Sequence, residues 1–221
     1  LSIRRQRQMC IRDSPNGPYS ITHFDDAEGN IRYRRINHTW VNGKCKYCGV
    51  SKKTALGNEN RKTELETHAY EWIHTDNPER LLNMKFDVII SNPPYQLDDG
   101  GNGASAKPIY HRFIEQAKKL NPRYLTMIIP ARWYAGGKGL DNFRKSMLDD
   151  GQISHLVDYV NAKDCFPGIS IGGGVCYFLR TKGYSGRCHY TNIHDGHTST
   201  AIRRLNEYEV FIPVSYTHLT L

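Results

Sequence analysis

Hydrophobic and polar positions along the chain follow two different periods. Short apolar runs predict buried strands at 86–91 and 123–130, and two more strands are predicted at 153–160 and 173–180. Apolar residues recur at the spacing of one helical face at 107–120 and at 139–150. Strands and helices that alternate in this way are typical of an α/β sheet.

Each predicted helix has a defined apolar stripe, which predicts that one side packs against the sheet. In the first helix the stripe consists of Phe113, Ile114, Ala117 and Leu120. In the second it consists of Leu140, Phe143, Met147 and Leu148. Pro108 suits the first turn of the first helix, because a proline there loses no helical hydrogen bond. A further short strand is predicted at 69–76.

The N-terminal third has a pattern of short strands and turns over 20–50. Asn42-Gly43 is a strong hairpin signal, and Glu28-Gly29-Asn30 marks another hairpin. The polar residues 51–63 predict a linker. We therefore expect a cysteine-containing β-hairpin insertion at 15–60, a catalytic domain at 61–190 and the start of a further segment at 191–221.

The two ends of the chain lack the periodicity of the rest. Residues 1–14 (LSIRRQRQMCIRDS) and 214–221 (VSYTHLTL) resemble translated adapter sequence, and we expect both to be non-native. On that interpretation the native portion is an internal fragment of a longer protein. A genuine basic arm is the alternative for the N-terminal stretch.

Composition adds a basic charge balance. The formal net charge is +8 and the pI about 9.2, which suits a polyanionic partner such as nucleic acid, although a solvated basic surface has the same signature. The sequence has no apolar run of membrane-spanning length and no signal peptide. Six cysteines without a secretory signal indicate a reducing compartment. We expect a cytoplasmic protein of bacterial or phage-like origin.

The strand predicted at 86–91 ends at Asn92-Pro93-Pro94-Tyr95. Ligands of open α/β sheets bind outside the carboxyl ends of strands. Both prolines lack an N–H and restrict the preceding residue, so this loop is stiff and presents carbonyl acceptors. The side chain of Asn92 and the backbone carbonyl of Pro93 would hold the two N–H bonds of an exocyclic amino group. Tyr95 would stack on the ring, and a base from a duplex would have to be flipped out to reach it.

Asn-Pro-Pro-Tyr after a buried strand resembles the catalytic motif of N6-adenine-specific DNA methyltransferases of restriction–modification systems. Within them, the chain is most similar to the type that fuses modification and restriction. The resemblance covers most of residues 20–190. It implies a partial Rossmann-like, S-adenosylmethionine-dependent methyltransferase sheet, seven-stranded in the family with its last strand antiparallel. The implied cofactor is S-adenosylmethionine, and the implied partner is double-stranded DNA with a flipped adenine.

The same resemblance implies further site residues. It assigns catalysis to Asn92, Pro93, Pro94 and Tyr95. Asp76 and its neighbour Asn77 match the acidic position near the adenine part of the cofactor. Phe166, before Pro167, matches a second aromatic that sandwiches the target base against Tyr95. Independently of the resemblance, Arg132-Trp133-Tyr134 follows a strand at the same sheet edge as Tyr95 and is expected to line the channel for the target strand. The chain departs from the family in one respect, because no glycine-rich cofactor loop precedes the motif.

Cys45 and Cys48 have the Cys-x-x-Cys spacing that wraps one zinc ion. His38 is a candidate third ligand, and the candidates for the fourth are His68 or a cysteine outside this chain. A structural zinc site is one interpretation of this stretch, and a reduced hairpin without metal is the other. A redox pair is less favoured, because no βαβ unit surrounds it.

Three functions fit these patterns. The first is methyl transfer to N6 of a flipped adenine in DNA. The second keeps the chemistry but changes the acceptor to RNA guanine or a protein glutamine amide, since each offers a planar –NH2. The third is a catalytically inactive nucleic-acid-binding fragment, which the missing glycine loop favours for this chain.

Overall fold

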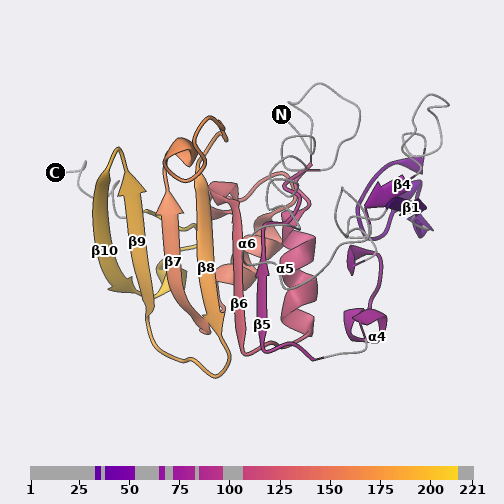
Figure 1. Ribbon diagram of the computed structural model, residues 1–221, viewed down its shortest axis with the longest axis horizontal. Helices are drawn as coiled ribbons and strands as arrows, with labels where there is room; N and C mark the ends of the chain where they lie inside the picture. The colour runs from indigo at the N-terminus through magenta and orange to yellow at the C-terminus, as the bar shows by residue number, and fades with distance from the viewer. Residues whose placement is uncertain are drawn as a thin grey trace, which may run out of the picture.

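The computed structural model describes residues 33–35, 38–52, 65–67, 72–82, 85–96 and 107–213. Its main feature is a six-stranded sheet in the order β10-β9-β7-β8-β6-β5 (Figure 1). In chain order its strands are β5 (Val88–Ser91), β6 (Tyr124–Pro130), β7 (Ile153–Tyr159), β8 (Val175–Thr181), β9 (Cys188–His194) and β10 (His197–Arg203). The helices are α4 (Pro78–Leu82), α5 (Tyr110–Lys119) and α6 (Asp141–Leu148), with short 3-10 helices η1 (Ala131–Tyr134), η2 (Ala162–Asp164) and η3 (Leu205–Glu207). The expected α/β fold is confirmed.

Strand directions in the sheet are mixed. β5 pairs parallel with β6, and β7 pairs parallel with β9. β8 is inserted between β6 and β7 and runs antiparallel to both. The methyltransferase resemblance implied that the last strand is antiparallel, but here two more strands, β9 and β10, follow β8 in the same sheet.

β5 forms one edge of the sheet, and this corrects the prediction of a buried strand at 86–91. Val88 and Ile90 are 49% and 76% exposed, whereas Ile89 packs against the main core. A strand that is covered on one face alternates in burial even when all its residues are apolar. The apolar run therefore identified the strand correctly but not its burial.

The helical stripes predicted from the sequence are confirmed except at Leu120, which follows the last residue of α5 and is only half-buried. In α6, Phe143, Met147 and Leu148 are buried, with Leu140 just before the helix. On α5 the buried residues are Tyr110, Phe113, Ile114, Gln116 and Ala117. Pro108 lies before α5 instead of in its first turn, because it forms an isolated bridge with Gln96. Residues from both helices and from β6 to β9 form the main core.

β9 and β10 form a hairpin that the sequence analysis did not predict. The turn is Asp195-Gly196, with φ angles of 49° and 76°, and positive φ at both positions is the requirement of a tight two-residue hairpin turn. β9 crosses the expected boundary at residue 190 and adds to the same sheet.

Gly174 allows β8 to enter between its neighbours. Its φ is +74°, and a Cβ there would meet the Tyr159 carbonyl oxygen at 2.2 Å and the Val160 carbonyl oxygen at 2.8 Å. The Gly174 carbonyl accepts a hydrogen bond from the Ala131 N–H at 3.1 Å. A side chain would therefore collide with the backbone next to β7.

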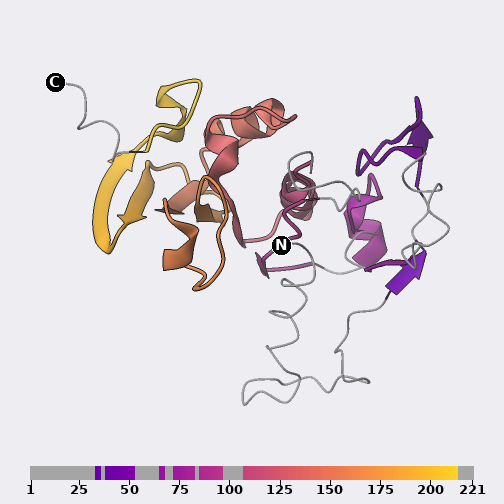
Figure 2. The ribbon, with the colours of Figure 1, turned by 90° about the horizontal axis from the view of Figure 1, so that it is seen from above.

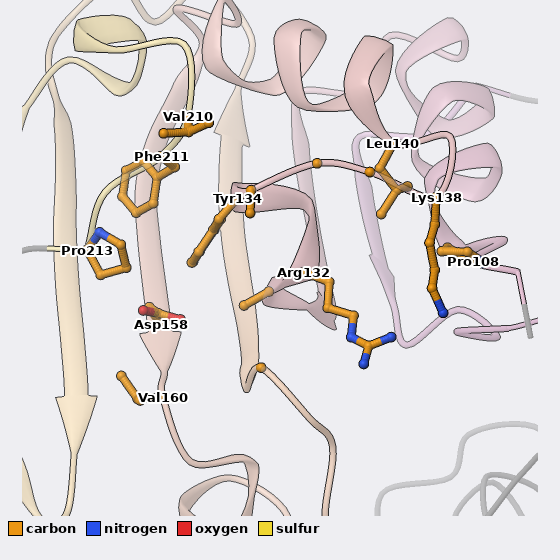
Figure 3. Close-up of a pocket in the computed structure, with 15 residues that line it drawn as sticks. Pro108, Arg132, Tyr134, Lys138, Leu140, Asp158, Val160, Val210, Phe211 and Pro213 are labelled. Carbon is orange, nitrogen blue, oxygen red and sulfur yellow. The ribbon is translucent and has the colours of Figure 1, made fainter. Parts of the chain in front are cut away.

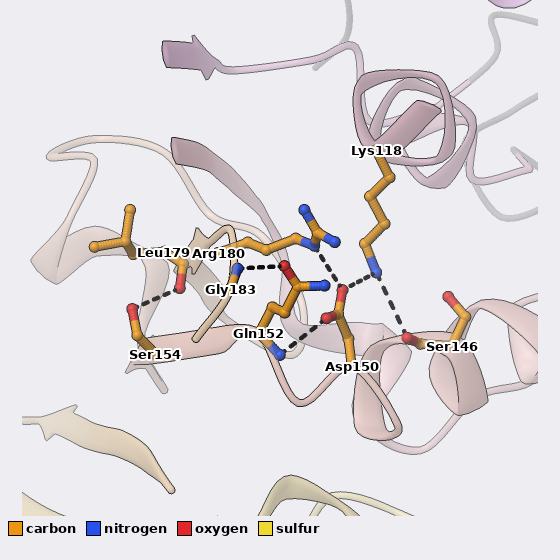
Figure 4. Close-up of polar contacts among 8 residues, drawn as sticks. All are labelled: Lys118, Ser146, Asp150, Gln152, Ser154, Leu179, Arg180 and Gly183. Carbon is orange, nitrogen blue, oxygen red and sulfur yellow. Dashed lines mark hydrogen bonds and ion pairs between the residues drawn. The ribbon is translucent and has the colours of Figure 1, made fainter. Parts of the chain in front are cut away.

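At the opposite end of the sheet, Asp150 joins α5 to β8 (Figure 4). Its Oδ2 lies 2.7 Å from the Lys118 amine and 3.0 Å from Arg180 Nε. Burial alone would raise the pKa of the Asp150 carboxyl, but the Lys118 hydrogen bond and the two cations hold it below its ordinary value. Burial lowers the pKa of Lys118 against the pull of Asp150. We take the carboxylate as ionised, because two cations face one anion.

A smaller region lies on the far side of α5 from the sheet (Figures 1 and 2). It contains α4 and two short strand pairs, β1 (Tyr33–Arg35) with β4 (Leu65–Thr67) and β2 (Trp40–Val41) with β3 (Lys44–Cys45). The β2–β3 turn is Asn42-Gly43, with φ angles of 49° and 73°. This confirms the second predicted hairpin, and the turn at 28–30 lies outside the described residues.

The strand predicted at 69–76 is wrong over its described part, residues 72–76. Trp72 and Ile73 form a helical turn, and bends follow. The Gln116 side-chain amide donates to the carbonyls of Trp72 and Thr75, at 2.7 and 2.6 Å, so a side chain replaces a strand partner. None of the helices in the described part of the chain is long and apolar enough to cross a membrane.

Candidate active site

Asn92 to Tyr95 follow β5 directly and leave the carboxyl edge of the sheet. Asn92 is exposed, Pro93 is buried, and Pro94 and Tyr95 are half-buried. The Tyr95 carbonyl accepts a hydrogen bond from the Ile109 N–H at 3.1 Å. The loop is thus fixed to the start of α5, while the Asn92 side chain stays accessible.

The Tyr95 ring is partly buried and packs against the main core of the protein. Burial raises the pKa of its phenol, with the neighbouring thiols Cys165 and Cys176 adding to the effect. Its hydroxyl is buried and has no hydrogen-bond partner in the described part of the chain. Tyr95 is therefore a neutral phenol with a buried, unsatisfied hydroxyl, next in the chain to the ledge formed by Asn92 and Pro93.

Phe166 lies in the neighbourhood of Tyr95. It is half-buried, and its N–H donates to the Ala162 carbonyl at 2.8 Å at the end of η2. The adjacent Cys165 is one of the groups that act on Tyr95. Within the described residues the two rings make no direct ring contact. The fold therefore brings the two predicted stacking residues to one region without setting them face to face.

A pocket of about 560 Å³ lies at the same edge of the sheet (Figure 3). Pro108, the bridge partner of Gln96, contributes to its wall and connects it to the loop at 92–95. Arg132 and Lys138 carry cationic side chains around it, and Gly136 and Gly137 line it with backbone. Its size and apolar wall suit a flat molecule with a few polar groups.

Asp158 is a pocket residue that the sequence analysis did not select. It lies on β7 and is only 2% exposed, and its Oδ2 accepts hydrogen bonds from the Tyr190 hydroxyl at 3.1 Å and the Asn192 amide at 3.0 Å. Burial raises the pKa of its carboxyl, despite the opposing hydrogen bonds. Ser154 and His155 lie in the same strand, so the sequence pattern did not distinguish Asp158.

The segment Arg132-Trp133-Tyr134 only partly meets its prediction. Arg132 is exposed beside the pocket, and its Nε donates to the Gly172 carbonyl at 3.3 Å. Trp133 is fully buried and belongs to the core. Tyr134 is nearly buried, although its edge lines the pocket. The prediction that all three line a channel is therefore wrong for Trp133.

Asp76 and Asn77 lie in the smaller region and not at the sheet edge. The Asp76 carboxylate accepts hydrogen bonds from the Lys46 amine at 2.7 Å and the Tyr47 hydroxyl at 3.2 Å. The Lys46 hydrogen bond lowers the pKa of Asp76. The Asn77 N–H donates to Thr75 Oγ1 at 3.1 Å. Over the described ranges we find no hydrogen bond or ion pair between these residues and 92–95.

The predicted metal ligands do converge. His38, Cys45 and Cys48 lie together, and His74 joins them, with one ligand atom of each within 4.8 Å of all the others. Sequence spacing gave no signal for His74, which comes from a separate segment. The other predicted candidate, His68, lies outside the described residues.

The comparisons with known proteins agree with the chemistry of the Asn-Pro-Pro-Tyr loop. Residues 3–166 match the model of the Eco57I restriction-modification methylase family. The chain is 39% identical over 209 residues to an uncharacterized adenine-specific methylase of Mycoplasma pneumoniae. That alignment covers 85% of this chain and 49% of the relative, so the chain spans about half the length of the protein it matches.

Solved structures give weaker similarities. A type I restriction–modification methyltransferase subunit from Streptococcus thermophilus is 16% identical, with a TM-score of 0.35, over 51% of this chain and 26% of that one. A modification subunit of a type I restriction enzyme from Vibrio vulnificus is 14% identical, with a TM-score of 0.37, over 53% and 28%. The assignment rests on the family match and not on these structures. The chain belongs to the Eco57I restriction-modification methylase family.

Proposed function

We propose that this chain is a segment of a DNA methyltransferase that modifies N6 of a flipped-out adenine. The observation that carries the proposal is the exposed Asn92 side chain on a rigid loop at the carboxyl end of β5. The Asn92 side-chain oxygen and the Pro93 carbonyl each accept one N–H of the adenine amino group. Held in this way, the nitrogen lone pair is turned out of the ring system and toward an electrophile.

Two further features support a planar base as the acceptor. The pocket beside the loop has the volume and the largely apolar wall that a purine requires. The Tyr95 ring follows the ledge in the same loop, and its stacking on a base would contribute about 1–3 kcal/mol. Phe166 approaches from the η2 segment and would move onto the other face of the base. Arg132 and Lys138 would contact the phosphates on either side of the flipped nucleotide.

S-adenosylmethionine, which the family resemblance implies, would supply an electrophilic methyl group. The described residues fit this cofactor poorly. Asp76, the predicted contact to its adenine, already accepts from Lys46 and Tyr47. We therefore propose that residues 92–95 orient the adenine amino group. We assign the binding of S-adenosylmethionine to none of the described residues. Because the proposed substrate is DNA, we propose the cytoplasm as the location of the enzyme.

The test is a methylation assay on the purified full-length protein that contains this chain. It is incubated with S-adenosylmethionine and unmethylated DNA, and N6-methyladenine is measured by mass spectrometry after digestion to nucleosides. Asn92→Ala is expected to lower the rate by about 100-fold or more, because an amine that is not oriented rarely attacks in line. Asn142→Ala, an exposed position on α6, is the matched control and should retain full activity.

Two outcomes would contradict the proposal. If Asn92→Ala formed N6-methyladenine at the full rate, the ledge of Asn92 and Pro93 would have no role in catalysis. Methylation of RNA guanine or a protein glutamine amide in parallel assays, with none of DNA, would keep the ledge and replace the acceptor.

A further inference from the structure

We infer that His38, Cys45, Cys48 and His74 form a tetrahedral zinc site that fastens the β2–β3 hairpin to the segment at 72–76. One ligand atom of each residue lies within 4.8 Å of the other three. The Cys48 sulfur and His38 Nδ1 are 3.6 Å apart. Zinc bonds of about 2.3 Å to sulfur and 2.0 Å to nitrogen place neighbouring ligand atoms about 3.3–3.8 Å apart in a tetrahedral site. The cluster thus needs only a small contraction around the ion.

The hairpin shapes the two-cysteine half of the site. Cys45 N–H donates to the Val50 carbonyl at 2.8 Å, and Gly49 N–H donates to the Cys45 carbonyl at 3.0 Å. Gly49 has a φ of 76°, so the chain turns back directly after Cys48. This geometry aims both sulfurs to one side of the turn. Both cysteines are free thiols and are buried, at 3% and 8% exposure.

One ligand, His74, comes from a distant part of the chain, whereas His38 belongs to the same segment as the two cysteines. The His74 and His38 rings meet edge to face, with centroids 5.0 Å apart. His74 is held in place by its neighbours, since Ile73 is 2% exposed and Gln116 binds the carbonyls of Trp72 and Thr75. The His74 imidazole therefore reaches the thiols on a backbone that α5 has already fixed.

The donor set decides between a metal and simple packing. Buried thiols alone are common in cores without any metal. Here two sulfurs and two imidazoles meet from separate segments, and two sulfurs with two nitrogens in tetrahedral order select zinc. Two thiolates also balance the charge of Zn²⁺, so the occupied site is neutral and suits its buried setting.

The site would hold together a region in which the described residues form only a small core. The small cluster contains Cys45, Cys48 and Ile73, completed by Ile109 and Phe113 from the α5 side. Lys46 and Tyr47, inside the Cys-x-x-Cys turn, bind Asp76 two residues beyond His74. The ion would therefore act as a structural fastener between the hairpin and α5. This inference is independent of the proposed methyl transfer.

The experiment measures the zinc content of the purified full-length protein by inductively coupled plasma mass spectrometry, under reducing conditions. One zinc per chain is expected. His74→Ala and Cys45→Ser should each weaken zinc binding by about 100-fold or more, measured by competition with a chromogenic chelator. His197→Ala, an exposed histidine on β10, is the matched control and should leave the affinity unchanged.

His74→Cys keeps the test decisive if the alanine variants do not fold. It should retain the metal, and after cobalt substitution its sulfur-to-cobalt charge-transfer band should be stronger than in the parent, because a third thiolate is bound. An unchanged cobalt spectrum would remove His74 from the site. A protein that contains no zinc, or that carries a Cys45–Cys48 disulfide, would overturn the inference altogether.

Discussion

The sheet body at 85–96 and 107–213 and the smaller region beyond α5 are held together in different ways. The body has a continuous core to which helices and strands both contribute, with Trp133, Leu125 and Met147 fully or almost fully buried. The smaller region has strands of only two or three residues and a cluster in which two of the five buried residues are cysteines. Apolar burial stabilises the first, whereas the second depends on α5, on polar contacts and on the inferred metal.

The largest expected effect is in the body. Trp133→Ala removes a fully buried ring, whose Nε1 donates to Cys176 Sγ at 3.4 Å, and should lower the free energy of unfolding by about 4 kcal/mol. Urea denaturation followed by circular dichroism measures it. Ile202→Ala, at a 60% exposed position, should cost less than about 0.5 kcal/mol. Equal losses from both variants would mean that the body has no such core.

Metal removal should act only on the smaller region. A strong chelator is expected to raise the hydrogen-exchange rates of amides at 38–52 by about 100-fold, since local opening no longer breaks metal bonds. Exchange in β6 and β7 should stay the same. Mass spectrometry of peptides from both regions measures the two rates together. A parallel rise in β6 and β7 would show that the regions unfold as one unit.

His111 on α5 should make stability depend on pH. Burial, assisted by the charge of Arg112, lowers its pKa to about 4 from an ordinary 6.5. Below pH 6.5 the unfolded chain binds a proton at His111 that the folded chain does not bind. The free energy of unfolding is therefore highest above pH 6.5 and falls as the pH drops toward 4. We expect a loss of about 2 kcal/mol across this window.

The matched comparison for this effect is a pair of variants. His111→Gln should remove this part of the pH dependence, and the exposed His155→Gln should leave it intact. Urea midpoints at a series of pH values measure both. If His111→Gln kept the full dependence, another group would be responsible.

The smallest effect should come from the exposed pair between Lys46 and Asp76. Lys46→Met is expected to leave the urea midpoint of the body unchanged, because solvent and salt screen such pairs. Hydrogen exchange at 38–52 should rise slightly at low salt and not at high salt. A shift of the body midpoint would tie the two regions together more closely than their cores indicate.

Local signals in the sequence were enough for much of the fold. The apolar periods located β5 to β8, α5 and α6, and Asn42-Gly43 located the hairpin. The Asp195-Gly196 turn carried the same kind of signal for β9 and β10 and was missed. The strand expected at 69–76 failed because Trp72 and Thr75 find a side-chain partner in Gln116, which no periodicity reveals.

The candidate site divides in the same manner. Asn92 to Tyr95 could be identified because residue type and position after a strand carry the chemistry, and their catalytic role stays a prediction. His74 and Asp158 could not, since both gain their meaning from segments that meet only in three dimensions. The cofactor role predicted for Asp76 also stays a prediction, and its pairing with Lys46 was not foreseen.

Gly174 has a consequence for how this protein can vary. Because a methyl group there would overlap two backbone oxygens beside β7, mutational drift is barred at this position even in copies that have lost all activity. Gly172, where a methyl group would come no closer than 3.6 Å to the Arg132 side chain, is free to change. If related sequences keep glycine at 174 while position 172 varies, the glycine at 174 is required by the fold and not by the reaction.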